Sequence, residues 1–527
     1  MCFIKNLINN IVKKESFFIL VLFFLSISDL YYYIKNQHFT YCVYYISACF
    51  ISTFIISLII QYSGKLKKVL QIILCTFLLI YSIINFFCIN LIRAPLNNGA
   101  LALIFATDIN EASEFIQTYI NPLDVIIISL GIIITIVLNN NKVCNFIRKL
   151  GENIPFWMIL ILLICSLCLT LRNHHVIYEL PFGRVITIYN EGIEVPPILI
   201  KYKTNPSFIE TSTNHPENIV VIIGESFAKS HSSLYGYNKE TNPKLAIHKE
   251  TGNLHLFYNI TSPASHTADA FKAILNTFSY NVDNNIPWYK HTSIPESFNN
   301  LGYSTKWISN QNKVGIYDNI PTRFSALCNN RIFIRENTAK ECYDEACISY
   351  INDSLNYKEI TFIHLMGQHQ TYKERYPLSY NIFSKNDYID FPKHQRETLA
   401  QYDNATIYND FVINTIINYF EEKEAIIIYF PDHGHDIYYT DENYCGHGIT
   451  AIAESDSIGK VIPFMIYTSN LYKKRFPETT QRIIESSNNI FNTENIIFTL
   501  LDIAGYSFID NNNVDSFSLL NRKQKGY

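Results

Sequence analysis

The first 172 residues contain five long apolar stretches that carry almost no charge. These stretches cover residues 17–34, 41–62, 69–91, 123–138 and 156–171. An apolar helix of about 20 residues crosses the roughly 30 Å of a bilayer's hydrocarbon core. The whole chain is only 17% charged, below the roughly 25% usual for soluble proteins. The sequence therefore predicts a transmembrane domain of five helices over residues 1–172. One cleaved signal peptide is excluded, because there are five segments and no small-residue cleavage site follows the first.

The orientation follows from the positive charges between the apolar stretches, since loops rich in Lys and Arg stay in the cytoplasm. Such residues precede the first stretch and separate the second from the third and the fourth from the fifth. They are Lys5, Lys13, Lys14, Lys65, Lys67, Lys68, Lys142, Arg148 and Lys149. The loop between the third and fourth stretches carries Asp108, Glu111 and Glu114 instead. We expect a cytoplasmic N-terminus and, after five crossings, an exported remainder.

The exported part divides into a proline-rich linker with short helices, residues 173–216, and a larger folded domain, residues 217–527. In the latter, short β-branched runs alternate with helical segments such as 398–419. The runs cover residues 218–223, 304–308, 361–365, 425–430 and 461–467. Continuous apolar runs of this length are typical of strands buried on both faces of a mostly parallel sheet. We predict a doubly wound α/β domain.

The net charge and the cysteines of the chain bear on its partners and on its disulfide bonds. The net charge of −4 and the absence of a basic tract argue against nucleic acid as a partner. Cys328, Cys342, Cys347 and Cys445 belong to the exported part, where disulfides are permitted. The spacing allows Cys342 to pair with Cys347 or with Cys328, and the sequence does not choose.

Polar residues follow three of the predicted strands. Ligands of such sheets bind beyond the carboxyl ends of the strands. The first strand runs into Glu225, the third contains His364 and runs toward His369, and the fourth runs into Asp432 and His433. We therefore expect these carboxylates and imidazoles to meet at one edge of the sheet.

Glu225, Asp432 and His433 form a ligand set of two oxygens and one nitrogen. This set suits Zn²⁺ and leaves a fourth position open for a reacting group. Gly434 allows a tight turn after the pair. The alternative interpretation is a surface turn in which Asp432 caps the next helix.

If such a metal site performs a phosphoryl transfer through a covalent intermediate, it also requires an activated hydroxyl near the metal. The candidates are Thr261, Ser262, Ser265 and Thr267. Thr267 opens a predicted helix over residues 268–278, whose N-terminus favours a phosphate dianion. Thr267 as a simple helix cap is the alternative, and this reasoning does not separate Thr267 from Ser265.

Three further histidines belong to the same region: His364, His369 and His447. They could bind a second metal, hold the substrate phosphate or protonate a leaving alkoxide. The alternative is a solvated or core histidine, and it is strongest for His364, which lies within a strand. His435 at most supports neighbouring ligands.

The ordered motifs resemble those of bacterial phosphoethanolamine transferases in the alkaline phosphatase superfamily, over essentially the whole chain. The matching stretches are 221–226, 233–237, 241–243, 261–267, 364–369, 376–377, 402–405, 432–434 and 447–448. The resemblance implies five membrane helices followed by a sulfatase-like α/β domain.

The resemblance also assigns site residues. It implies that Glu225, Thr267, Asp432 and His433 bind the catalytic Zn²⁺ and that Thr267, rather than Ser265, is the nucleophile. His369 and His447 match histidines that contact phosphate or an additional zinc, and His364 matches a further histidine near the site. The loop 97–117, with Asn98, Thr107 and Glu111, is similar to a periplasmic segment that helps to hold the lipid substrate.

The activity implied is an inner-membrane transfer of phosphoethanolamine from phosphatidylethanolamine to lipopolysaccharide, through a phospho-threonine, with the catalytic domain in the periplasm. Members that act on lipid A commonly carry a cysteine where this chain has Pro263, so the chain looks more like the branch that modifies the lipopolysaccharide core. Residues 266–270 are also similar to lipoteichoic acid synthases, which transfer glycerol phosphate. A phosphate or sulfate ester hydrolase and a non-catalytic envelope protein are the remaining alternatives.

Overall fold

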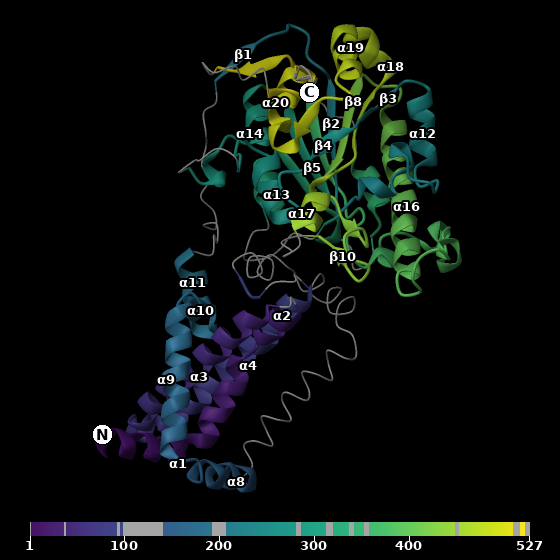
Figure 1. Ribbon diagram of the computed structural model, residues 1–527. Helices are drawn as coiled ribbons and strands as arrows, with labels where there is room; N and C mark the ends of the chain where they lie inside the picture. The colour runs from purple at the N-terminus through teal and green to yellow at the C-terminus, as the bar shows by residue number, and fades with distance from the viewer. Residues whose placement is uncertain are drawn as a thin grey trace. The chain divides into compact units, whose positions relative to one another are not determined.

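A computed structural model describes residues 2–35, 38–91, 95–97, 141–191, 207–280, 286–311, 320–336, 342–351, 358–447, 453–509 and 517–521. The chain forms two compact units (Figure 1). The first consists of helices, and the second contains the strands. The domain boundaries at residues 172 and 216 stay predictions.

The first unit contains two helical segments that are long and apolar enough to cross a membrane, Phe39–Gln61 and Gly64–Ile89, and a shorter apolar helix, Phe156–Arg172. Its described helices are α1 (Cys2–Ser26), α2 (Leu30–Lys35), α3 (Phe39–Gln61), α4 (Lys67–Leu91), α8 (Asn141–Glu152), α9 (Phe156–Arg172), α10 (Val176–Glu179) and α11 (Pro181–Glu191). The predicted segment 123–138 lies outside the described residues. The described helices agree with a helical membrane region, and the count of five crossings stays a prediction.

Two short helices of the predicted linker region, α10 and α11, belong to the first unit, and α11 packs on its other helices. The Arg184 guanidinium is 2.5 Å from the fully buried carboxylate of Asp29. The ring of Phe182 stacks on Phe77 with centroids 4.9 Å apart. A buried charge is costly unless it is paired, so this ion pair fixes α11 to the turn after α1.

The second unit is built on a seven-stranded sheet in the order β3-β11-β8-β2-β7-β5-β6. The strands are β2 (Asn218–Gly224), β3 (Leu254–Phe257), β5 (Ser304–Ser309), β6 (Asn330–Phe333), β7 (Glu359–His364), β8 (Ala425–Pro431) and β11 (Phe464–Thr468). Five neighbouring strands are parallel, while β11 runs antiparallel to both of its neighbours. The predicted α/β domain is therefore confirmed with a mixed sheet. The run 461–467 correctly predicted the strand β11. Its antiparallel direction was not predicted, because it depends on the path of the chain between β8 and β11.

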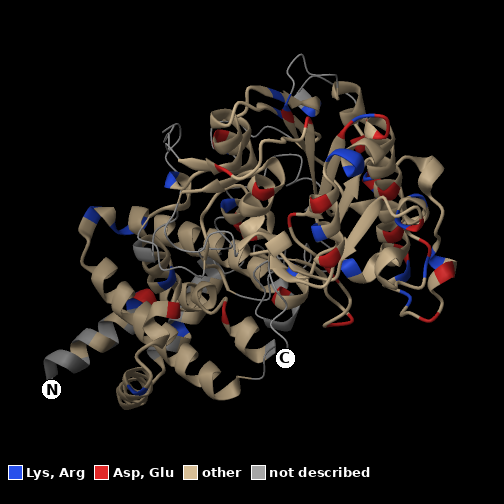
Figure 2. Ribbon diagram, turned by 90° about the horizontal axis from the view of Figure 1, so that it is seen from above, with Lys and Arg blue, Asp and Glu red and all other residues tan. Residues whose placement is uncertain are grey.

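Helices cover both faces of this sheet (Figure 1). They are α12 (Pro243–Glu250), α13 (Thr267–Ile274), α14 (Ile294–Asn300), α15 (Ile320–Ser325), α16 (Arg396–Phe420), α17 (Ala453–Lys460), α18 (Asn470–Arg475), α19 (Pro477–Glu485) and α20 (Ile496–Ala504). Small two-stranded sheets pair β1 (Phe208–Glu210) with β13 (Tyr506–Phe508), β4 (Asn259–Thr261) with β12 (Ile490–Asn492), and β9 (Asp436–Ile437) with β10 (Cys445–Gly446). Figure 2 shows acidic and basic residues interspersed over the helices and loops of this unit.

The central strand explains why its sequence is apolar without interruption. Ile219, Val221 and Ile223 belong to the core on one face of the sheet, whereas Val220 and Ile222 belong to the core on the other. Burying such a side chain contributes about 1.5–3 kcal/mol. Both faces of β2 are therefore stabilised by packing, and an alternating polar pattern would be unfavourable here.

The register of the sheet brings three strand ends to the same level. Ile223 of β2 pairs with His364 of β7, and Gly224 pairs with Pro431 of β8. Glu225 and Asp432, which follow these strands directly, therefore lie side by side at the carboxyl edge, as predicted for a site in a parallel sheet.

Candidate metal and nucleophile site

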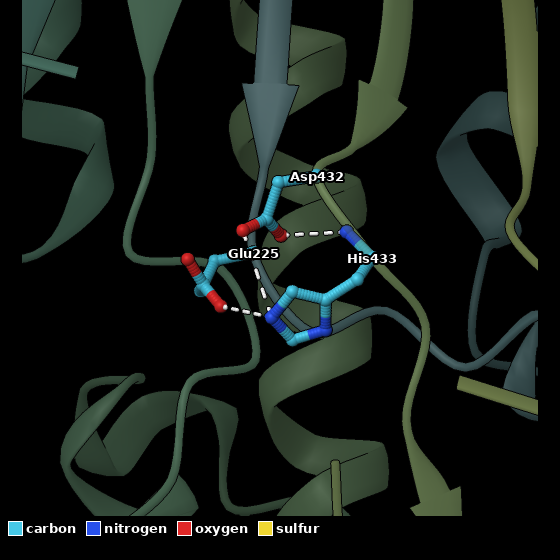
Figure 3. A group of neighbouring side chains, drawn as sticks. All are labelled: Glu225, Asp432 and His433. Atoms are coloured by element: carbon cyan, nitrogen blue, oxygen red, sulfur yellow. Dashed lines mark hydrogen bonds and ion pairs between the residues drawn. The ribbon is translucent and has the colours of Figure 1, made fainter. Parts of the chain in front are cut away.

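Glu225, Asp432 and His433 meet at this edge (Figure 3). Their ligand atoms all lie within 4.8 Å of one another. Nε2 of His433 is 3.1 Å from Oε1 of Glu225 and 3.6 Å from Oδ2 of Asp432. Asp432 and His433 are fully buried and Glu225 is 1% exposed. The alternative of a surface turn is therefore wrong.

The backbone around Asp432 and His433 orients this pair toward Glu225. The His433 N–H donates to Oδ1 of Asp432 at 2.8 Å. Nδ1 of His433 lies 2.7 Å from the Gly434 carbonyl, to which it donates a proton. This bond directs Nε2 toward the two carboxylates, and a metal that displaces the Nε2 proton would find the arrangement usual for a metal-binding histidine. A Cβ at Gly434 would lie 2.6 Å from the Val461 carbonyl oxygen, so the turn requires glycine.

The ionisation of these groups also fits a divalent cation. Burial, and then the nearby Glu225, raise the pKa of Asp432 to about 8. Burial alone would lower the pKa of His433, but Asp432 and Glu225 raise it to about 9. Oδ2 of Asp432 is buried and makes no hydrogen bond with any described residue. A divalent cation would supply the missing positive charge and a partner for this oxygen.

Thr267 brings a hydroxyl to the same three side chains. Its Oγ1 lies 3.2 Å from each carboxylate oxygen of Glu225 and 3.3 Å from Nε2 of His433. It is the first residue of α13, and His266 occupies the N-cap position. Thr267 is thus not the helix cap that the alternative interpretation supposed.

Ser265, the competing hydroxyl, has a different partner. Its buried Oγ lies 2.5 Å from Oδ1 of Asp456, a residue of α17. Ser262 donates to the carbonyl of Asp432. Among the predicted hydroxyls, the structure therefore brings Thr267 to the ligand set and engages Ser265 elsewhere.

Two of the predicted histidines belong to the surroundings of this set. The ring of His447 lies 4.3 Å from that of His433, and its Nδ1 is 3.0 Å from Nδ1 of His435. Nε2 of His435 in turn lies 2.7 Å from the Tyr372 hydroxyl, so His435 supports His447. Burial lowers the pKa of His369 to about 4, although the charge of Glu225 opposes this shift. His369 is therefore neutral at pH 7, with Nδ1 making no hydrogen bond to a described residue.

His364 lies in the core of the sheet. It is 1% exposed and packs edge-to-face against Phe271 and Trp307, at centroid distances of 5.0 Å and 5.7 Å. Burial lowers its pKa to about 4. These surroundings are the ones expected if His364 is a histidine of the core. A role for His364 in the reaction stays a prediction.

The shifted pKa of His364 predicts a dependence of stability on pH. The neutral ring is favoured in the folded state, so its contribution is complete above the unfolded pKa of 6.5. It is lost as the pH falls toward 4, because the unfolded chain then binds a proton that the folded chain excludes. Between pH 7 and pH 4 this group should lower the free energy of unfolding of the unchanged protein by up to about 3 kcal/mol. We expect His364→Gln to remove that loss. Thermal unfolding of the full chain in detergent between pH 7 and 4 measures it, and identical pH profiles for both proteins would contradict the prediction.

One residue that contacts Glu225 escaped the sequence analysis. The side-chain amide of Gln311 donates to Oε2 of Glu225 at 3.3 Å and to the Leu365 carbonyl at 3.1 Å. It follows β5, a fourth parallel strand. The sequence signal was its place just beyond a predicted strand, at the edge where the ligands converge.

Gly367 presses against the backbone of Glu225. Its φ is +51°, and a Cβ there would lie 2.8 Å from both the N and the O of Glu225. We expect Gly367→Ala to cost about 1–3 kcal/mol more than Gly302→Ala, since Gly302 has φ +76° but open space around its Cβ position. Thermal unfolding of both variants measures the difference, and equal costs would show that the contact with Glu225 does not matter.

Two other predictions concern regions away from the ligand set. Cys328 and Cys347 are thiols, so neither pairing considered for Cys342 is formed. The lipid-binding loop 97–117, with Asn98, Thr107 and Glu111, lies outside the described residues from 98 onward.

Known proteins are similar in sequence to this chain, and the similarity includes the second unit. The sulfatase family model matches residues 217–506. Phosphoethanolamine transferase EptC of Escherichia coli is 28% identical over 352 residues, which cover 63% of this chain and 57% of that protein. Phosphoethanolamine transferase EptA of Helicobacter pylori is 27% identical over 454 residues and 80% of each chain. The chain thus spans little more than half of the first of these relatives.

Two of the solved structures that are similar to the chain come from proteins named EptC and EptA. The C-terminal periplasmic domain of EptC from Escherichia coli, in complex with Zn, is 28% identical, with a TM-score of 0.54, over 61% of this chain and 91% of that domain. The integral membrane protein EptA from Neisseria meningitidis is 17% identical, with a TM-score of 0.68, over 94% of this chain and 96% of that one. The latter likeness shows a common fold that includes the helical unit.

Proposed function

Because the chain belongs to the sulfatase family, we propose that it is a zinc-dependent phosphoethanolamine transferase of the bacterial inner membrane. The proposed reaction moves phosphoethanolamine from phosphatidylethanolamine to lipopolysaccharide, core or lipid A, through a phospho-threonine at Thr267. The names of the relatives support the group that is transferred. The zinc complex of the EptC domain supports the metal.

The observation that carries the proposal is the position of the Thr267 hydroxyl. It lies within 3.2–3.3 Å of Glu225 and His433, two of the three residues of the candidate metal set. It also stands at the start of α13, where unpaired backbone N–H groups favour a phosphate. A hydroxyl in this position can reach both a metal and a phosphoryl group.

Glu225, Asp432 and His433 would hold the zinc together with Thr267. A bound zinc lowers the pKa of a nearby hydroxyl and stabilises the negative charge that develops on the phosphoryl oxygens. Glu225 accepts the Thr267 hydroxyl bond at 3.2 Å and can take its proton. His369 and His447, where a second metal would also bind, are the groups that we assign to the other proton transfers.

The transfer has two steps that balance. In the first, Oγ1 of Thr267 bonds to the phosphorus, the ester bond to the glycerol oxygen breaks, and that oxygen takes a proton to leave as diacylglycerol. In the second, a hydroxyl or phosphate oxygen of the acceptor bonds to the phosphorus while the bond to Oγ1 breaks and Thr267 regains its proton. The two displacements use the same set of groups in opposite order.

A membrane location agrees with this substrate pair. The donor and the acceptor are both lipids, and tethering raises their effective concentration at the site. The two apolar helical segments of the first unit support such a tether. We place the N-terminus in the cytoplasm and residues 173–527 in the periplasm, as the charge distribution of the loops predicts.

Labelled donors test the proposal. The purified full chain in detergent is incubated with phosphatidylethanolamine labelled in the ethanolamine group, quenched with acid and digested, and the label is located by mass spectrometry. Label on the peptide that contains Thr267 is expected. Label only from the glycerol phosphate group of phosphatidylglycerol would instead show a glycerol-phosphate transferase, and release to water without acceptor would show a hydrolase. Mass spectrometry of lipopolysaccharide then assigns the group to lipid A or to the core.

A further inference from the structure

Asp344 is a buried carboxylate that joins two segments of the site. It begins the short 3₁₀ helix Asp344–Tyr350 and is 4% exposed. Its Oδ1 and Oδ2 accept the backbone N–H groups of Met366 and Gly367 at 2.8 Å and 2.9 Å. Its Oδ1 also accepts the side-chain amide of Asn310 at 2.8 Å. A buried carboxylate with several N–H donors fixes the segments that supply those donors.

The first segment is the turn after β7, and it leads to Glu225. Gly367 packs on the backbone of Glu225, where even a Cβ would be too close. The next residue, Gln368, donates its N–H to the Glu225 carbonyl at 3.0 Å. His369 closes the turn with a bond from its N–H to the Met366 carbonyl at 3.1 Å. The turn held by Asp344 therefore sets the positions of both Glu225 and His369.

The second segment follows β5 and reaches Glu225 from another direction. The backbone N–H of Asn310 donates to the His364 carbonyl at 3.0 Å, and its side chain bonds Asp344. The adjacent Gln311 donates to the Glu225 carboxylate at 3.3 Å. Displacement of Asn310 would move Gln311, so both routes from Asp344 end on Glu225.

We propose that Asp344 is a positioning residue that holds Glu225 in the geometry needed to bind the metal and holds His369 beside it. The proposal rests on the proposed function for the identity of the metal and for its activity measurement. Groups that orient metal ligands typically change metal affinity or activity by 10–100-fold when they are removed. Asp344 acts through the turn 366–369 and through Gln311, which sequence analysis did not connect with it.

The chain offers a matched control in Asp410. This residue of α16 is fully buried and also accepts two backbone N–H groups, those of Lys244 and Leu245 at 2.9 Å and 3.0 Å. It fixes the start of α12 instead of a segment of the site. Asp344→Asn and Asp410→Asn each replace one acceptor oxygen by an amide, so both are expected to lower the Tm by several degrees.

The experiment compares both variants with the unchanged full chain in detergent. Equilibrium competition with a coloured chelator gives the zinc affinity, and transfer from labelled phosphatidylethanolamine gives kcat and KM. We expect Asp344→Asn to lower zinc affinity and kcat by about 10–100-fold, with a much smaller change in KM, whereas Asp410→Asn leaves both close to those of the unchanged chain. A zinc affinity that is unchanged in Asp344→Asn, or lowered equally in both variants, would overturn the proposal.

The unchanged chain could prove inactive, and Asp344→Asn could fail to fold. If the unchanged chain transfers no phosphoethanolamine, the proposed function fails, while the zinc affinities still decide the role of Asp344. If Asp344→Asn does not fold, Asn310→Ala removes only the second route, and it should weaken zinc binding relative to Asp410→Asn. Unchanged zinc affinity in Asn310→Ala would then count against the proposal.

Discussion

Replacing Thr267 by alanine is expected to abolish transfer, with kcat lowered by at least about a thousandfold. The variant lacks the only oxygen that can form the phospho-threonine, while Glu225, Asp432 and His433 are left in place. Thr267 is partly exposed, so the Tm should change little. Single-turnover incubation with labelled phosphatidylethanolamine measures both the rate and the trapped label.

Ser265→Ala is the matched control for this substitution. Ser265 lies two residues before Thr267, but its hydroxyl bonds Asp456. Loss of that buried bond should cost about 1 kcal/mol of stability and leave kcat within a fewfold. Full activity of Thr267→Ala, or a trapped label that survives in it, would end the proposed mechanism and return Ser265 to consideration.

Removal of zinc is expected to produce the second largest effect. Prolonged treatment with a chelator should abolish transfer, and added Zn²⁺ should restore it. Asp432→Asn should bind zinc at least about tenfold more weakly, because it removes the negative charge of the carboxylate whose Oδ2 makes no hydrogen bond to a described residue. Elemental analysis of the protein and the rate after metal addition measure these effects. Asp410 accepts backbone N–H groups at the start of α12 and is the control here too. The variant Asp410→Asn should keep its zinc.

The zinc-free protein should also become less stable as the pH rises from 6.5 to 8. The folded-state pKa values of Asp432 and His433 are raised to about 8 and about 9. For a raised pKa the stabilising contribution is present below the unfolded value and is lost as the pH rises through the folded value. Zinc replaces the protons on these groups, so the increase in Tm that zinc produces should grow with pH in this window. If zinc raises the Tm by the same amount at every pH in this window, then Asp432 and His433 do not bind protons there in the zinc-free protein.

The pattern of the sequence was sufficient to predict the strands that carry the site. The apolar runs 218–223 and 425–430 correspond to β2 and β8, because strands buried on both faces require apolar residues at every position. The same logic placed Glu225 and Asp432 at one edge before any distance was known. The run 461–467 predicted β11 but not its antiparallel direction, since burial is the same for either direction and only the connection decides it.

The sequence by itself determined which strands are buried on both faces, which polar residues follow them and which family motifs are present. Motif resemblance alone assigned the nucleophile to Thr267, and the structure adds that Ser265 is held by Asp456. Only the tertiary structure showed that His364 lies between aromatic rings and that Asp344 and Gln311 both lead to Glu225. Local sequence encodes burial and backbone preference, whereas contacts between residues so distant in the chain depend on sheet register and loop packing.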